Sequence, residues 1–155
     1  MSRFSIPTDV MVQTWDLLRR PGFEGLEAAA VWIGRRLPGG DVEILDVHMP
    51  EQLAYRSEFG VAVTILDEAL SRLIATLPLE CFVPIRLHTH PGPAYHSDTD
   101  DQNMLLSHMG AISIVIPDFA RDEIDLCSCS VNELNESHHW RELSPDEVKA
   151  RFIVR

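Results

Sequence analysis

The sequence predicts an α/β protein with one mixed β-sheet flanked by helices. Three observations support this fold class. Apolar residues at helical spacing alternate along the chain with short, continuous apolar runs of the kind found in buried strands. No internal repeat, low-complexity tract or linker interrupts this alternation, and a length of 155 residues suits one domain. We therefore expect a single domain over residues 1–155.

The first expected element is a helix over residues 10–20. Its apolar side chains recur every three or four residues, so that they share one face. Thr8 and Asp9 are of the residue types that cap helices, and we expect them to cap this one. The dipeptide Pro21-Gly22 is expected to end it.

Two strands should follow this helix. Residues 28–35 form a continuous apolar run, which indicates a buried strand. The Pro-Gly-Gly-Asp sequence at 38–41 predicts a turn, and residues 42–49 suit a second strand that pairs with the first. Residues 50–60 are mostly polar and are left as a connecting stretch.

A second helix is expected over residues 66–77, where leucines recur at helical spacing. Thr64 is a suitable cap for its start, and Pro78 should stop it. A strand over 82–88 comes next, with Pro84 placed near its start or at a sheet edge, because proline cannot donate to a ladder of hydrogen bonds.

The remaining elements are predicted from the same signals. They are a helix over 98–108, strands over 111–116, 124–131 and 139–143, and a last helical turn that opens with Ser144 as its cap and Pro145 in its first position.

Composition limits the classes of function. Apolar residues make up 45% of the chain, no run of them approaches the roughly 18 needed to span a bilayer, and the first residues lack the apolar core of a signal peptide. We expect a cytoplasmic protein without membrane contact. There are 13 basic against 24 acidic residues, a net charge of -11. Neutralising phosphates needs a basic surface, so nucleic acid is not an expected partner.

The three cysteines do not form a disulfide framework, since their number is odd and the expected compartment is reducing. Cys127 and Cys129 fall within the expected strand over 124–131, where alternation would put both on one face. No second cysteine pair completes a zinc site with them. We interpret them as two small side chains that face the core.

The segment that indicates chemistry begins with His88 and His90. At the end of a strand, residues two apart project from the same face, a few ångströms from each other, so both imidazoles could reach one metal ion. The sequence Pro91-Gly92-Pro93 prevents the strand from continuing. The chain must then turn over the end of the sheet, which can bring Asp100 back toward the histidines. Two histidines and one carboxylate form a catalytic type of zinc set that leaves a fourth position for water.

Ser97 and Asp100 also have a structural interpretation. Ser97-Asp98-Thr99-Asp100 resembles a capping arrangement, with serine at the cap and an acid three residues later. Such a cap would itself aim Asp100 at the loop, so both interpretations are compatible. Asp98 and Asp101 fit acids of a first helical turn, and His96 fits a loop residue.

The segment resembles the JAMM motif of the JAB/MPN metalloprotease family: a distant glutamate, then His-x-His-Pro, then Ser-x-x-Asp. The stretches 88–92 and 97–100 match it, and the apolar strand near 112–117 is also similar to the family. Six residues separate the second histidine from the serine, where the family usually has seven.

The family also has a glutamate at the head of an early strand, followed by an apolar run to a glycine. Glu27 keeps the seven-residue step to Gly34, although Ala30 replaces an inner glycine. Glu24 is the alternative, and we favour Glu27.

The resemblance implies a JAB/MPN architecture, which is similar to that of cytidine deaminases, and a zinc peptidase. His88, His90 and Asp100 would bind Zn²⁺. Glu27 would be the general base and would later protonate the leaving amine. Ser97 would donate a hydrogen bond to the developing oxyanion.

The implied substrate is the amide or isopeptide bond after the C-terminal glycine of a ubiquitin-like protein, with activating- and conjugating-type enzymes as further partners. Two alternatives remain open: a peptidase that releases an amino acid from the tail of a sulfur-carrier protein, and a non-catalytic MPN-like interaction domain.

Overall fold

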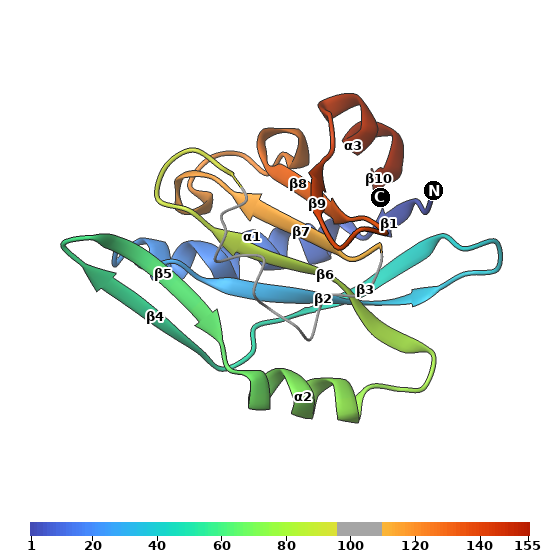
Figure 1. Cartoon of the computed structure of the whole chain (residues 1–155), viewed down its shortest axis with the longest axis horizontal. Helices are drawn as coiled ribbons and strands as arrows, with labels where there is room; N and C mark the ends of the chain where they lie inside the picture. Colours follow the sequence, from blue (N-terminus) through green and yellow to red (C-terminus); the bar gives the residue numbers. More distant parts are fainter. Residues whose placement is uncertain (96–109) are drawn as a thin grey trace.

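The computed structural model describes residues 1–95 and 110–155. Figure 1 shows their elements. In chain order these are β1 (Phe4–Ile6), α1 (Thr8–Gly22), β2 (Ala29–Arg36), β3 (Val42–His48), β4 (Gln52–Ser57), β5 (Gly60–Ile65), α2 (Asp67–Thr76), β6 (Cys81–Thr89), β7 (Ile112–Ile116), β8 (Ser130–Leu134), β9 (Trp140–Glu142), α3 (Pro145–Arg151) and β10 (Phe152–Val154), with 3-10 turns at Asp118–Ala120 and Leu126–Ser128.

The expected mixed sheet is confirmed. Its eight strands within the described residues lie in the order β10-β1-β3-β2-β6-β7-β8-β9, and β4 and β5 form a separate two-stranded hairpin. Strand β2 is antiparallel to both β3 and β6, whereas β6 and β7 run parallel. In the described residues no helix is long and apolar enough to cross a membrane.

The two faces of the sheet have separate cores. Alternation along β2 sends Ala30 and Trp32 to the face covered by α1, where the indole Nε1 of Trp32 donates to the hydroxyl of Thr14 (2.8 Å). It sends Ala29 and Val31 to the other face, which α2 and β5 cover. Figure 1 shows α1 running behind the strands, with α2 and the β4–β5 hairpin on the opposite side. Of strand β6, this second core includes Val83 near the start of the strand and no residue near its end at Thr89.

Two of the predicted helix caps are wrong. Helix α1 begins at Thr8 with Pro7 in the cap position and no side-chain cap, because the Thr8 amide donates to the carbonyl of Arg155 (2.7 Å) and the chain enters the helix earlier. Thr64 lies inside β5, opposite Leu53, so that Leu66 precedes α2 instead. By contrast, the Ser144 cap is confirmed as a full capping box with Glu147.

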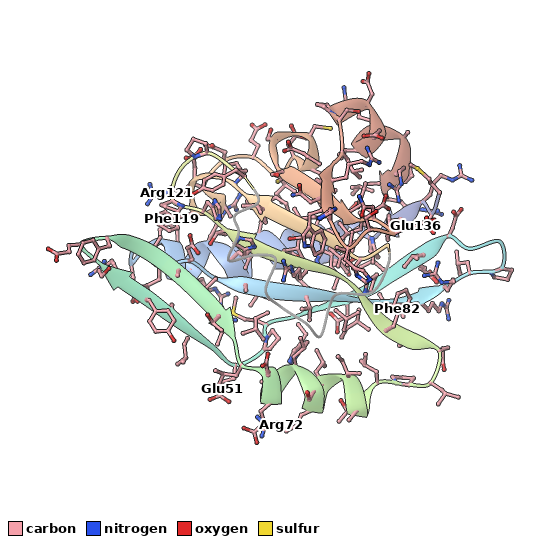
Figure 2. All side chains as sticks on the ribbon, viewed as in Figure 1. Glu51, Arg72, Phe82, Phe119, Arg121 and Glu136 are labelled. Carbon is pink, nitrogen blue, oxygen red and sulfur yellow. The ribbon has the colours of Figure 1, made fainter. Side chains whose placement is uncertain are left out.

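The stretch over 50–60 contains structure that the sequence analysis missed. The hairpin of β4 and β5 pairs over its whole length, from Gln52 opposite Ile65 to Ser57 opposite Gly60. The Gln52 amide group joins it to the main sheet by accepting from the Ala29 N–H and donating to the Ala29 carbonyl, each at 2.9 Å. Figure 2 labels Glu51 and Arg72 at the base of the hairpin, where the two side chains form an ion pair across to α2 at 3.8 Å.

The strand predicted over 124–131 is wrong over residues 124–129. Residues Leu126–Ser128 form a 3-10 turn, because the Asp125 carboxylate accepts from the Cys127 amide (2.9 Å) and the Ser128 hydroxyl (2.9 Å). The strand itself, β8, runs over Ser130–Leu134. The strands predicted over 28–35, 42–49, 82–88, 111–116 and 139–143 are confirmed as β2, β3, β6, β7 and β9.

Pro84 lies in the central strand β6, not at an edge. The pairing of β6 with β2 is irregular there, passing from Ile85 opposite Trp32 to Phe82 opposite Gly34, and pairing with β7 starts only at Ile85. A bulge therefore accommodates the missing N–H. The helix predicted over 98–108 lies outside the described residues.

Candidate metal centre

The two motif histidines lie together at the end of β6. His88 is the next-to-last residue of the strand, and His90 follows its end, so that alternation directs both to the face that carries α2 and the hairpin. Their Nε2 atoms are 3.2 Å apart, and their ring centroids are 5.0 Å apart. Both imidazoles are buried, with exposed fractions of 8% and 6%.

This separation fits a shared metal ion. Zinc–nitrogen bonds are 2.0–2.1 Å long, so two imidazoles bound at a tetrahedral angle place their nitrogens about 3.3–3.4 Å apart. The observed 3.2 Å is close to that value, and it also lies at the long end of the hydrogen-bond range. The separation of the pair is therefore compatible with two ligands to one ion.

Glu27 lies on the neighbouring strand beside this pair. The Ala28 amide donates to the Thr89 hydroxyl and the Thr89 amide donates to the Ala28 carbonyl, both at 3.0 Å, which extends the pairing of β2 and β6 beyond the ladder. That register puts Glu27 opposite His90, and the glutamate is 7% exposed. Glu24, the alternative base, lies exposed in the turn after α1.

The other predicted site residues, Ser97 and Asp100, lie outside the described residues. Within residues 1–95 and 110–155, no group of three His, Cys, Asp or Glu side chains could hold a metal ion. Among these residues, the two histidines therefore do not by themselves belong to a three-ligand site.

A cleft opens beside His90. It has a volume of about 490 Å³. Glu27 and His90 lie at its inner wall, the start of β5 from Gly60 to Val63 forms one side, and the loop of Pro91 to Pro93 borders it. The cleft thus exposes a strand next to the candidate metal ligands.

Two parts of this site were missed at the sequence level. One is β5, whose alternating Val61 and Val63 after Gly60 could have indicated a hairpin strand. The other is Tyr95, whose ring packs edge-on against His90 with centroids 4.7 Å apart. No local signal predicts that contact, since it depends on how the Pro-Gly-Pro loop folds back.

The cysteine pair is not part of this centre. Burial raises the pKa of the Cys129 thiol to about 12, with further contributions from Asp125 and Cys127. Within residues 1–95 and 110–155, neither Cys127 nor Cys129 belongs to a group of three side chains that could hold a metal ion. We expect Cys129→Ser to retain the metal content of the wild type, measured by elemental analysis after gel filtration. Loss of half or more of the metal would indicate that Cys129 is a metal ligand.

Comparison with known proteins gives a relative over nearly the whole chain. Over 151 residues the chain is 33% identical to "Probable metalloprotease y4jG" of Sinorhizobium fredii, covering 97% of this chain and 92% of that protein. The chain belongs to the family of this probable metalloprotease. No protein-family model matches the chain.

A solved structure supports the fold alone. The solution structure of a protein from Salinibacter ruber superposes with a TM-score of 0.58 over 97% of this chain and 90% of that one, at 16% sequence identity. Membership of the metalloprotease family supports a peptidase function in general, and it agrees with the ligand geometry of the histidine pair.

Proposed function

We propose that the protein is a zinc-dependent isopeptidase of the JAB/MPN type that carries a JAMM motif. The observation that supports this most is the 3.2 Å separation of the His88 and His90 Nε2 atoms next to a buried Glu27. A buried acid beside two converging imidazoles is the arrangement that metal-assisted hydrolysis needs.

In this proposal His88, His90 and Asp100 would hold Zn²⁺, which when bound would supply Lewis acidity at the scissile carbonyl and a lower pKa for water. Glu27 accepts a proton from the attacking water and delivers it to the leaving amine. Ser97 donates a hydrogen bond to the developing oxyanion, an effect worth about 3 kcal/mol at comparable sites.

The proposed substrate is the amide or isopeptide bond after the C-terminal glycine of a ubiquitin-like protein. The cleft supports this choice because β5 lies along one side, and an extended tail can add to a strand edge through main-chain hydrogen bonds. Glu27 and His90 lie in the same cleft, so a tail next to β5 would carry its last peptide bond toward them.

The experiment compares metal content and cleavage. We expect about one zinc per chain after dialysis, and cleavage of a ubiquitin-like protein joined through its last glycine to a lysine side chain. Removing the metal with 1,10-phenanthroline should abolish cleavage, and added Zn²⁺ should restore it.

Two other results would replace the proposal. Selective release of a single amino acid from a sulfur-carrier tail would favour the small peptidase. Failure to retain any metal, with no cleavage of either substrate, would favour a non-catalytic MPN-like interaction domain.

A further inference from the structure

The chain after β7 makes an unusual backbone turn. Asp118, Phe119 and Ala120 have φ values of 54°, 54° and 59°, so three consecutive residues with side chains lie in the left-handed region. That region is disfavoured for most residues other than glycine, asparagine and aspartate, and it is normally visited by single residues. Three in succession persist only where the surrounding structure imposes them, and such strain tends to collect near functional sites.

The end of β7 and this turn together hold the backbone of His90. The His90 amide donates to the carbonyl of Ile116 (2.9 Å), and the Phe119 amide donates to the carbonyl of His90 (2.8 Å). The Asp118 amide donates to the carbonyl of Gly92 (3.0 Å). Both polar backbone groups of the histidine, and the loop after it, are therefore bound to the segment from 116 to 119.

His88 does not need this support. It lies within β6, opposite Ala29 on one side and Val115 on the other, so the sheet fixes its backbone. His90 lies beyond the last β6 residue, and Pro91 after it cannot continue a ladder. The separation of the two Nε2 atoms thus depends on His88, held within the sheet, and on His90, whose amide is bound by the last residue of β7 and whose carbonyl is bound by the turn.

Helix α1 supports the turn from the other side. The Nε of Arg19 donates to the carbonyl of Ala120, and its Nη2 donates to the carbonyl of Asp122 (2.9 Å). A Cβ at Gly22 would lie 2.6 Å from the Cβ of Phe119, so the helix backbone touches that residue directly. Figure 2 labels Phe119 next to Arg121, whose guanidinium lies 5.2 Å from the ring centroid.

We infer that the left-handed turn at 118–120, supported by Arg19 and Gly22 of α1, is the element that positions His90 for metal binding. Arg19 is then a positioning residue for the site, about 70 residues away in sequence and without contact to the ion. This inference rests on the proposed function, because it gives the turn a role in assembling the same ligand pair.

The test compares Arg19→Ala with Arg20→Ala, a matched control that removes the neighbouring exposed arginine of the same helix. In the metal-free protein, Arg19→Ala should speed hydrogen exchange of the His90 and Phe119 amides by about tenfold. Its affinity for Zn²⁺, measured by competition with a chromophoric chelator, should fall by about tenfold, as is typical when a supporting contact of a ligand is lost. Arg19→Lys, which can reach only one of the two carbonyls, should lie between.

Gly22→Ala provides a second variant that acts through steric contact and should change the same two readouts. The inference is overturned if Arg19→Ala and Gly22→Ala show the same amide exchange rates at His90 and Phe119, and the same affinity for Zn²⁺, as Arg20→Ala. A loss of zinc affinity that merely follows a uniform loss of thermal stability and of protection throughout the sheet would also overturn it. Failure of the wild type to bind Zn²⁺ would contradict the proposed function instead, and the exchange rates would still decide whether the turn holds His90.

Discussion

Glu27→Ala is expected to lower kcat by a factor of about 10²–10⁴ and to leave zinc bound, because it removes the group that transfers the proton without removing a metal ligand. Glu27 is buried and lines the cleft together with His90. The measurement is cleavage of the ubiquitin-like conjugate, together with metal content by elemental analysis. Glu27→Gln should behave in the same way, since it keeps the shape of the side chain and loses the basicity.

The matched control is Glu24→Ala. Glu24 is exposed in the turn after α1, and its carbonyl accepts from Arg56 (2.7 Å), an interaction that the substitution leaves intact. Its kcat should stay within a factor of two of the wild type. Normal cleavage by Glu27→Ala would contradict the proposed role of Glu27 as general base. Loss of cleavage in Glu24→Ala would assign the proton transfer to Glu24.

The convergence of His88 and His90 could be predicted from the sequence because it depends on local strand geometry. A strand fixes the direction of residues two apart, and the Pro-Gly-Pro sequence fixes where the strand stops. These two facts alone predict that His88 and His90 converge, and the structure brings their Nε2 atoms to 3.2 Å. The position of Glu27 followed from a family resemblance and not from a local rule, since its neighbour β6 is about 60 residues away.

Other features depend on contacts that no local pattern encodes. The left-handed turn at Asp118–Ala120 contains no glycine, so its backbone conformation follows from Arg19, Gly22 and the carbonyl of His90. The bulge that accommodates Pro84 arises from a change of register between β6 and β2. The sequence rule that excludes proline from central strands holds for regular ladders, and a bulge removes the requirement for the N–H.

His90→Ala is expected to weaken Zn²⁺ binding by more than about 100-fold and to abolish cleavage, because an ion held by two protein ligands in place of three loses both affinity and geometry. His88→Ala should have the same effect. His48→Ala is the control: that histidine is exposed at the end of β3 and should bind zinc like the wild type. Retention of full affinity in His90→Ala would mean that the 3.2 Å pair is an ordinary contact between two rings.

The third ligand can be identified in the same assay. Within residues 1–95 and 110–155 no group of three His, Cys, Asp or Glu side chains could hold a metal ion, and Asp100, the proposed third ligand, lies outside these residues. Asp100→Ala should therefore match His90→Ala in its loss of zinc, while Asp98→Ala and Asp101→Ala, which alter the net charge equally, should retain it. If Asp100→Ala kept its zinc and one of the other two lost it, the ligand would be that aspartate, and the Ser-x-x-Asp spacing would then reflect only a helix cap. Because all three variants change the charge by the same amount, a difference among them reports coordination and not a general electrostatic effect.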